Sequence, residues 1–436
     1  MTLQTGVPPR LFAQFTPKIY TLLRGGYDLG ALRADAFAGL TVAIVALPLS
    51  MAIAIASGLS PDRGLYTACV GGFVISALGG SRFQIGGPAG AFIVLIAGIV
   101  EARGYGGLAL ATAMGGAIMV VAGLLRLGSL VKYVPMAVTI GFTAGIAAII
   151  FASQVRELLG LDLAHEPAAL LPKLAALAGA LGSLRPEALA ISAFSIASIL
   201  AVRHWRPRWP AMLIAVAAGA ILAAALGWDV ATIGSRYGAM PRGLPAPSWP
   251  SATWPELAAL LPDALAIALL GAIESLLCAV VADRIGGGQH RSNGELVAQG
   301  VANVASVVFG GMPVTGAIAR TATNVRAGAR SPVAGMLHAL YILAIMLVAA
   351  PLASYIPLAS LGAVLAVVAW NMAERHAVGA MLRRRDGATL VLLATFLLTI
   401  FRDLTLGIGV GLALSAVLHL ASKGKGRKSP SAAPLH

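Results

Sequence analysis

Charged residues are scarce in this sequence, and their scarcity excludes an ordinary water-soluble domain. Asp, Glu, Lys and Arg make up 11% of the 436 residues, whereas soluble domains carry about 25%. Apolar residues make up 58%, and the mean hydropathy is +0.87. A single core stops growing beyond roughly 250–300 residues and would not hide this much apolar surface. We therefore expect lipid to be the solvent for most of the chain.

Cysteine is also rare, and the patterns of familiar enzymes are missing. Cys69 and Cys278 lie in apolar stretches and form no CxxC pair, so they indicate neither a metal site nor a disulfide framework. The seven His are scattered, and HExxH, GxSxG and a Walker A loop are absent. We expect no enzyme activity, no catalytic residue, no metal and no cofactor. Without a nucleotide site, any pumping must be secondary. Residues 1–33 contain no cleavable apolar region, so no signal peptide is expected.

Acidic residues are few, which leaves a formal charge of +14. The basic residues sit in short clusters between apolar runs, a pattern typical of loops that face anionic lipid and not of nucleic-acid binding. With the N-terminus inside, 21 Lys and Arg fall on the inner side and eight on the outer side. The eight are Arg63, Arg103, Arg156, Lys173, Arg185, Arg236, Arg242 and Arg402. The asymmetry predicts a multi-pass protein of the cell (inner) membrane, with both termini cytoplasmic.

Apolar segments long enough to cross or half-cross a bilayer follow one another with short breaks. They predict an all-α membrane protein with about fourteen segments: 36–56, 64–79, 88–100, 107–125, 130–152, 187–202, 211–227, 257–282, 294–309, 316–326, 332–350, 357–371, 387–400 and 404–421. Residues 167–183 are expected to form an interfacial helix. The predicted division is a cytoplasmic segment 1–34, a first membrane repeat 35–227, an outer loop 228–256, a second repeat 257–421 and a basic cytoplasmic tail 422–436.

Three short patterns recur at nearly one spacing along the chain. Asp35-Ala-Phe-Ala and Asp263-Ala-Leu-Ala open corresponding segments, Gly79-Gly80 matches Gly310-Gly311, and Gly90 matches Gly316. Because each copy holds an odd number of crossings, the second copy enters from the opposite face. The pattern predicts a seven-plus-seven inverted repeat, in which two corresponding broken helices indicate a binding site near the midplane.

Segments three and ten, 88–100 and 316–326, are short, and each follows a Gly/Pro break. A helix that begins at the midplane leaves its first N–H groups without partners and carries the positive end of its dipole. Two such ends that face each other predict an anion site. The predicted donors are the N–H groups of Gly90, Ala91, Phe92, Gly316, Ala317 and Ile318. The alternative is that these glycines and prolines only kink packed helices.

Two charged side chains lie within predicted membrane segments. Arg320 falls one turn into the second short helix, and Glu274 lies in the middle of segment 257–282. Such residues usually face a cavity or a partner and mark a functional site. Protonation, cation binding and pairing with Arg320 all stay open for Glu274. Snorkelling of Arg320 and a structural ion pair are the alternatives. Glu295, Gln299 and Asn303 share one helix face, which favours polar contact between helices.

At these residues the chain resembles the SulP sulfate-permease family, the prokaryotic relatives of animal sulfate and anion exchangers. The matching stretches span both repeats in order: 39–48, 58–67, 86–90, 274–277, 293–300 and 310–321. The resemblance implies core and gate subdomains, a homodimer, and a substrate between segments three and ten. By position it places Leu47, Pro48, Leu49, Ser50, Ala89, Gly90, Ala91, Phe92, Glu274, Gly316, Ala317, Ile318 and Arg320 at the site.

Two departures from the family pattern matter. Many members have Gln after the Leu-Pro of the first helix, where this chain has Leu49. Members usually continue into a cytoplasmic STAS domain, which does not follow Ser422 here. We expect a secondary transporter of a small anion (sulfate, bicarbonate, a dicarboxylate or a halide) by alternating access, with proton- or sodium-coupled symport through Glu274. A nucleobase transporter of the same fold and an anion channel remain the alternatives.

Overall fold

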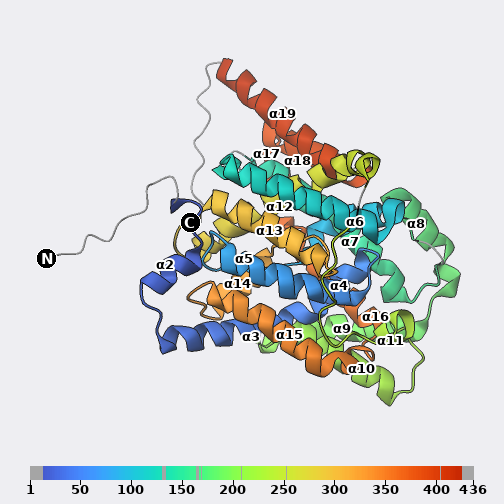
Figure 1. Ribbon diagram of the computed structural model, residues 1–436. Coiled ribbons are helices and arrows are strands. Elements are labelled where there is room, and N and C mark those ends of the chain that lie inside the picture. Colours follow the sequence, from blue (N-terminus) through green and yellow to red (C-terminus); the bar gives the residue numbers. More distant parts are fainter. Residues whose placement is uncertain are drawn as a thin grey trace.

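The computed structural model describes residues 13–129, 134–163, 166–167, 169–207, 209–251, 253–402 and 404–424, and the fold over these residues is almost entirely helical (Figure 1). Within these described ranges, six helices are long and apolar enough to cross a membrane by length and composition. The predicted all-α class is therefore confirmed. The count of fourteen segments and the division of the chain into domains stay predictions. Residues 1–12 and 425–436 of the two predicted cytoplasmic ends lie outside the described residues.

The first half of the chain places helices close to the predicted segments. A short helix, α2, leads into a long one, and the third predicted segment begins as a 3₁₀ turn, η2. The elements are α2 (Lys18–Arg24), α3 (Leu29–Ala56), α4 (Pro61–Tyr66), η1 (Thr67–Gly71), α5 (Gly72–Leu78), β1 (Gly86–Gly87), η2 (Gly90–Phe92), α6 (Ile93–Leu124), α7 (Met136–Leu159), α8 (Leu170–Gly179), η4 (Leu181–Ser183), α9 (Pro186–Trp205) and α10 (Ala211–Ala225).

The second half begins with a loop that carries one short helix. It then repeats the order of elements seen in the first half, in which a long helix is followed by a break and a short helix. Its elements are α11 (Ile233–Tyr237), α12 (Trp254–Gly286), α13 (Ser292–Val308), β2 (Thr315–Gly316), α14 (Ile318–Arg326), α15 (Val333–Ala353), α16 (Leu358–Met372), α17 (Arg375–Arg384), α18 (Gly387–Phe401) and α19 (Leu404–Gly424). The short helices α2, α11 and α17 were not predicted, because none has an apolar run long enough to span a bilayer.

Segments three and four follow each other within α6, which consists of two helices joined across a kink at Gly104. In α6 the backbone turns at Gly104, with φ 65° and ψ −174°. That φ lies in the left-handed region, which glycine adopts at little cost. The predicted break at 101–106 therefore falls at this kink between the two helices.

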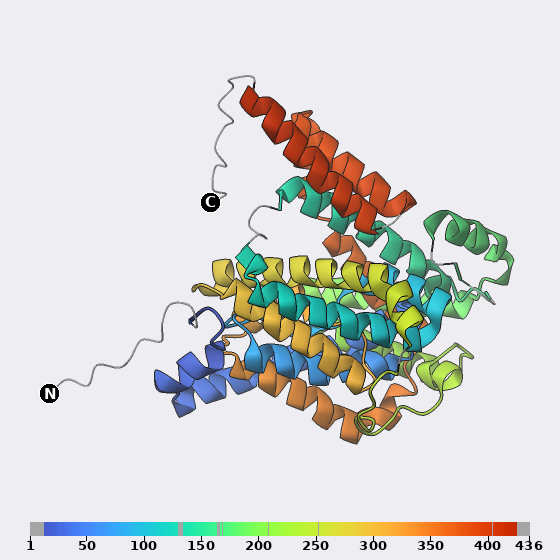
Figure 2. The same cartoon turned by 45° about the horizontal axis from the view of Figure 1, so that its top comes forward.

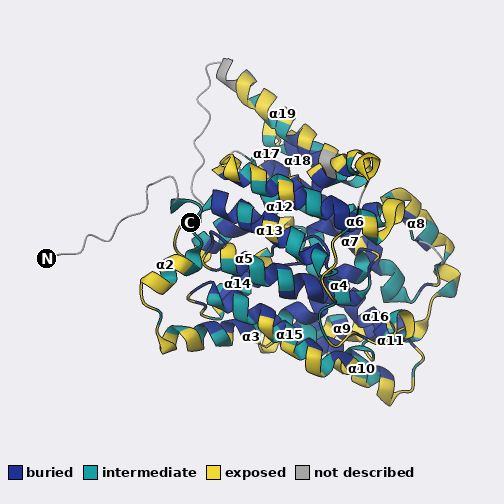
Figure 3. Ribbon diagram, in the orientation of Figure 1, coloured by how far each residue is buried: buried dark blue, intermediate teal, exposed yellow. Residues whose placement is uncertain are grey.

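The helices pack in two groups. In one group α6 lies against α12 and α13, and α15 lies against α3 and α5. In the other group α7 packs against α16 and α18, while α9 packs against α10 and α16. Figure 2 shows α18 and α19 side by side at one edge of the bundle. Buried residues fill the centre and exposed ones cover the rim (Figure 3). Helix α3 touches both groups, through α15 and through α16.

Many large apolar side chains lie on the outer surface, as expected where lipid replaces water. Val348 is 84% exposed, and Phe37, Ile221 and Leu352 are similarly open. Soluble monomers rarely show apolar surface this extensive. This exposed apolar surface is what the apolar composition predicts for a chain embedded in lipid.

Candidate functional site

The two halves of the chain meet in a two-stranded antiparallel sheet in the middle of the bundle. Gly86 of β1 pairs with Gly316 of β2, and Gly87 pairs with Thr315. The Ala317 N–H donates to the Ile85 carbonyl at 2.9 Å, and the Ile85 N–H donates to Thr321 Oγ1 at 3.0 Å. The two breaks that the sequence placed in corresponding positions are therefore bonded directly to each other, and the two short helices begin beside one another.

The free N–H groups differ slightly from the predicted set. Phe92 N–H donates to the Ala89 carbonyl at 3.2 Å, and Ala317 N–H is used by the sheet. Helix α14 begins at Ile318. The first N–H group that donates along the helix is that of Thr321, which donates to the Ala317 carbonyl. The N–H groups without an intrahelical acceptor are therefore those of Gly90 and Ala91 at one end, and of Ile318, Ala319 and Arg320 at the other.

Helix α12 packs against β2 and α14 of the second break. Ser275 Oγ and Thr315 Oγ1 lie 2.6 Å apart, and Cys278 Sγ lies 3.2 Å from Thr321 Oγ1. A Cβ atom at Gly271 would lie 3.2 Å from Met119 Sδ, so this glycine allows α12 to approach α6 closely. Residues at 271, 275 and 278 follow one face of the helix, since residues three and four apart are neighbours.

Glu274 extends from this stretch of α12 and is half-buried. Within the described part of the chain its carboxylate has no hydrogen-bond partner and no basic group within the salt-bridge limit of 4.0 Å. Pairing with Arg320, one of the three predicted options, is therefore not realised in this conformation. An unpaired carboxylate inside a bilayer is costly, so proton binding and cation binding remain.

Arg320 lies in the first turn of α14 and is only 1% exposed. Its Nη2 donates to Ser50 Oγ at 3.0 Å, while Nε and Nη1 have no partner among the residues that the structure describes. A Cβ atom at Gly87 would lie 1.9 Å from Nη1, so the guanidinium occupies the space that a side chain there would need. The guanidinium of Arg320 therefore lies against Gly87 of β1 and beside Ser50 of α3.

The predicted residues of the first helix are all buried in α3. Leu47, Leu49 and Ser50 are 9%, 6% and 0% exposed. Pro48 removes one backbone donor from the helix, and the Ser50 carbonyl would lie 2.0 Å from a Cβ atom at Gly64 of α4. This part of α3 is therefore packed closely against α4, and Ser50 is the residue through which it contacts Arg320.

Two polar side chains of α13 support the breaks. Asn303 Nδ2 donates to the Val314 carbonyl at 2.8 Å, and Val314 N–H donates to Asn303 Oδ1 at 3.0 Å. Glu295 accepts from the N–H groups of Gly80 and Ser81 at 2.8 and 3.0 Å. Both side chains bond to loop residues and not to a neighbouring helix, which differs from the predicted polar contact between helices. Both side chains replace the backbone partners that the interrupted segments lack.

The predicted residues differ in accessibility. Ile318 is 46% exposed and Ala319 is exposed, while Gly90 and Glu274 are partly accessible. Ala89, Ala91 and Phe92 are buried at 7%, 1% and 0%. A Cβ atom placed on Gly90 would lie 3.3 Å from Met372 of α16 and 3.4 Å from Ile150 of α7. Residues of the second helix group thus cover the end of η2.

Sequence reasoning missed one residue close to this region. His338 of α15 is 0% exposed, and neither of its ring nitrogens has a partner. The Ser76 hydroxyl and both amide atoms of Gln84 are also buried without partners. The sequence signal for His338 was an ionisable residue in the middle of an apolar helix, which often marks a functional site. Among the described residues, no group of three or more His, Cys, Asp or Glu gathers to hold a metal.

The comparisons with known proteins agree with this geometry. Residues 32–395 match the model of the sulfate permease family. The chain belongs to this family. It is 44% identical over 396 residues to the putative sulfate transporter YvdB of Bacillus subtilis, which covers 91% of this chain and 75% of that protein. The match confirms the family resemblance that the motifs indicated.

Solved membrane domains share the fold of this family member. The transmembrane domain of a cyanobacterial bicarbonate transporter, BicA, superposes with a TM-score of 0.79 at 31% identity, over 88% of this chain and 98% of that one. The murine Solute Carrier 26 family member A9 anion transporter, in its inward-facing state, has a TM-score of 0.84 at 18% identity, over 97% and 74%. The second likeness concerns the fold alone.

Proposed function

We propose that this sulfate permease family member carries a small anion across a membrane, and that the anion binds between the N-terminal ends of η2 and α14. The observation that supports this most is the sheet between β1 and β2, which brings the two helix ends side by side. Their free N–H groups and dipoles favour negative charge. Arg320 adds a full positive charge with two guanidinium nitrogens that have no partner among the described residues, and no carboxylate in α14 offsets it.

The proposed substrate is a small inorganic or organic anion of the sulfate, bicarbonate, dicarboxylate or halide class. One relative carries the name of a sulfate transporter and another that of a bicarbonate transporter. A nucleobase carrier of the same fold is disfavoured because α14 has the sequence IARTATNVR, with Arg320 and no acidic residue. Nucleobase recognition would instead call for a carboxylate on each of α12 and α14.

The proposed transport cycle moves the two helix groups relative to each other. The helix ends, Glu274 and Arg320 belong to the group built on α3, α6 and α12 to α15, whereas Ile150 and Met372, which cover Gly90, belong to the other. Separation of the groups would uncover the anion on one side at a time. This is alternating access, in which two global states differ in which face reaches the ligand.

A cation is proposed to bind with the anion through Glu274. Its carboxylate has no partner in the described part of the chain, and a neutralising proton or Na⁺ would make the nearby anion easier to hold. Coupling of this kind is reciprocal, since each ligand raises the affinity for the other. We also propose a homodimer in the cell membrane, with both ends of the chain on the cytoplasmic side, as the basic residues indicate.

The test is uptake into proteoliposomes that contain the purified protein. Sulfate, bicarbonate, a dicarboxylate and chloride are each offered with no gradient, with a pH gradient and with a sodium gradient. The proposal predicts saturable uptake of at least one anion and accumulation above equilibrium with one of the gradients. Uptake of uracil but of none of the anions would contradict it. A flux that does not saturate and follows membrane voltage would indicate a channel.

A further inference from the structure

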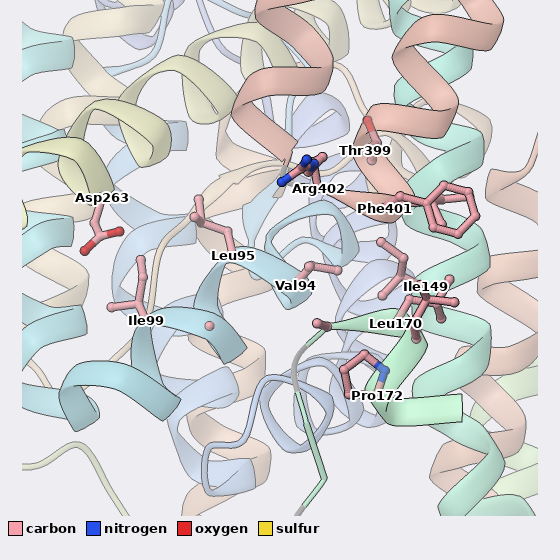
Figure 4. A pocket seen from close by; sticks show the side chains of 14 residues that line it. Val94, Leu95, Ile99, Ile149, Leu170, Pro172, Asp263, Thr399, Phe401 and Arg402 are labelled. Atoms are coloured by element: carbon pink, nitrogen blue, oxygen red, sulfur yellow. The ribbon is translucent and has the colours of Figure 1, made fainter. Parts of the chain in front are cut away.

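A cavity of about 370 Å³ lies between the two helix groups, beyond the end of η2. Leu95 of α6 forms one wall, and Ile149 of α7 with Thr399 of α18 forms the other (Figure 4). Leu95 comes one turn after Gly90, and Ile149 adjoins Ile150, which covers Gly90. The cavity therefore begins about one helical turn from the proposed anion site and is separated from it by apolar side chains.

Two charged residues line this otherwise largely apolar cavity. Asp263 lies near the start of α12 and Arg402 follows the end of α18, so they belong to different helix groups. Figure 4 shows them on opposite sides of the cavity, with Leu95 between them. Arg402 is exposed and Asp263 is half-buried. Over the described residues neither side chain has a hydrogen-bond or ion-pair partner.

Comparison with the first repeat shows that the freedom of Asp263 is unusual. Its sequence counterpart, Asp35, is 0% exposed and accepts from the N–H groups of Arg330 and Ser331 at 2.6 and 3.1 Å. Tyr27 also donates to it, at 2.7 Å. The Asp35 carboxylate thus stabilises the turn before α15, whereas the Asp263 carboxylate makes no such bond to the described residues. An unpaired charge in a membrane helix costs free energy. This cost points to a functional role for Asp263.

The cavity has room for a small ligand. Thr399 also lines it but is only 3% exposed, and its hydroxyl lies toward α19, where a Cβ atom at Gly407 would be 2.4 Å from Thr399 Oγ1. Liquid water takes about 30 Å³ per molecule, so the cavity has room for a small anion together with several waters.

We infer that this cavity is a second, weaker anion site, the vestibule through which the anion passes on its way to the helix ends. This inference rests on the proposed function. Arg402 attracts the anion from one wall of the cavity. Asp263 on the opposite wall limits how tightly the anion is held and pairs with Arg402 when the walls close. Passage along a path requires that each site bind the anion strongly enough to be occupied and weakly enough to release it.

The kinetic test compares right-side-out with inside-out membrane vesicles at fixed ionic strength. For anion offered on the cavity side, Arg402→Gln should raise the half-saturating concentration about three- to tenfold, because a charged cleft concentrates ligands of opposite sign. Asp263→Asn should lower it. Neither change should affect anion offered on the other side. Arg242→Gln removes the same charge from an exposed residue outside the cavity and serves as the control.

Equal half-saturating concentrations for wild type and Arg402→Gln on both sides would overturn the inference. A shift of the same size on both sides would overturn it as well, because it would show a general effect of net charge. If the wild type takes up no anion at all, the proposed function fails, and the cavity must be tested without transport.

A labelling experiment supplies that independent test. Cys69 and Cys278 are buried, so the wild type should not react with a membrane-impermeant thiol reagent. Leu95→Cys should react from one side only, and sulfate or chloride should slow the reaction. Ile96→Cys, one residue further and 0% exposed, is the matched control and should not react. If Leu95→Cys stays unlabelled, or if neither anion slows its labelling, the cavity is not an anion vestibule.

Discussion

Arg320 donates a hydrogen bond from Nη2 to Ser50 Oγ at 3.0 Å, and the two residues are 270 positions apart in the chain. The bond joins the first long helix of one half, α3, to the short helix of the other, α14. It uses one of the donors of the guanidinium and leaves Nε and Nη1 free. A buried cation with spare donors beside two helix ends is arranged to attract an anion.

Removal of this charge should weaken anion binding while the fold survives. A hydrogen bond to a charged group contributes about 1.5–3 kcal/mol, so Arg320→Ala should raise the half-saturating concentration roughly ten- to a hundredfold or abolish uptake. Arg326→Ala is the control, because Arg326 is exposed in the last turn of the same helix. Uptake and anion-dependent thermal stabilisation equal to wild type would show that Arg320 is only structural.

A methyl group at Gly87 should act on Arg320 indirectly. The new Cβ atom would lie 1.9 Å from Nη1, a distance that forces the guanidinium to move. Gly87→Ala should therefore reduce anion affinity in the same direction as Arg320→Ala, and it should have little further effect in the double variant. Gly106→Ala is matched, since nothing lies within 4 Å of its Cβ. Additive losses in the double variant would contradict the shared mechanism.

The Asn303 side chain should matter for stability as well as for the site. Asn303→Ala leaves the N–H and carbonyl of Val314 buried without their partners. Each unsatisfied group costs about 1–3 kcal/mol, so we expect a lower unfolding temperature in detergent and weaker anion binding. Val301→Ala, on the exposed face of the same helix, should change neither much. If Asn303→Ala unfolds at the wild-type temperature, Asn303 does not support the break.

Glu274→Gln tests the coupling and not the anion site. The amide cannot bind a proton or a metal cation as a carboxylate does, so gradient-driven accumulation should stop. Anion binding or exchange down a gradient should persist, because the helix ends and Arg320 are unchanged. The measurement is concentrative uptake under imposed pH and sodium gradients. A variant that still accumulates substrate to the wild-type level would show that Glu274 has no part in coupling.

Much of the fold follows from features that act over short distances in the sequence. Apolar runs gave helices near the predicted places, and the Gly/Pro breaks at 86–90 and 310–316 became the two strands and the short helices after them. The pairing of Gly86 with Gly316 could be anticipated only through the repeat, since no local pattern specifies a partner so far along the chain.

Other features depend on packing that the sequence does not show. The predicted donors at Phe92 and Ala317 proved to be occupied by Ala89 and Ile85, because strand pairing decides where a short helix begins. The side chain of Arg320 turned toward Ser50 and not toward Glu274, which no spacing rule predicts. Asp35 and Asp263 carry the same motif, yet only Asp35 became a buried acceptor.

The most direct test of the central claim is the position of a bound anion that can be identified by its own scattering. Crystals of the protein grown with selenate, an analogue of sulfate, or with bromide should show an anomalous peak between the N-terminal ends of η2 and α14, within hydrogen-bond distance of the Gly90 or Ile318 N–H groups. The peak should vanish in Arg320→Ala. An anomalous peak elsewhere, in crystals of protein that takes up the same anion, would contradict the account.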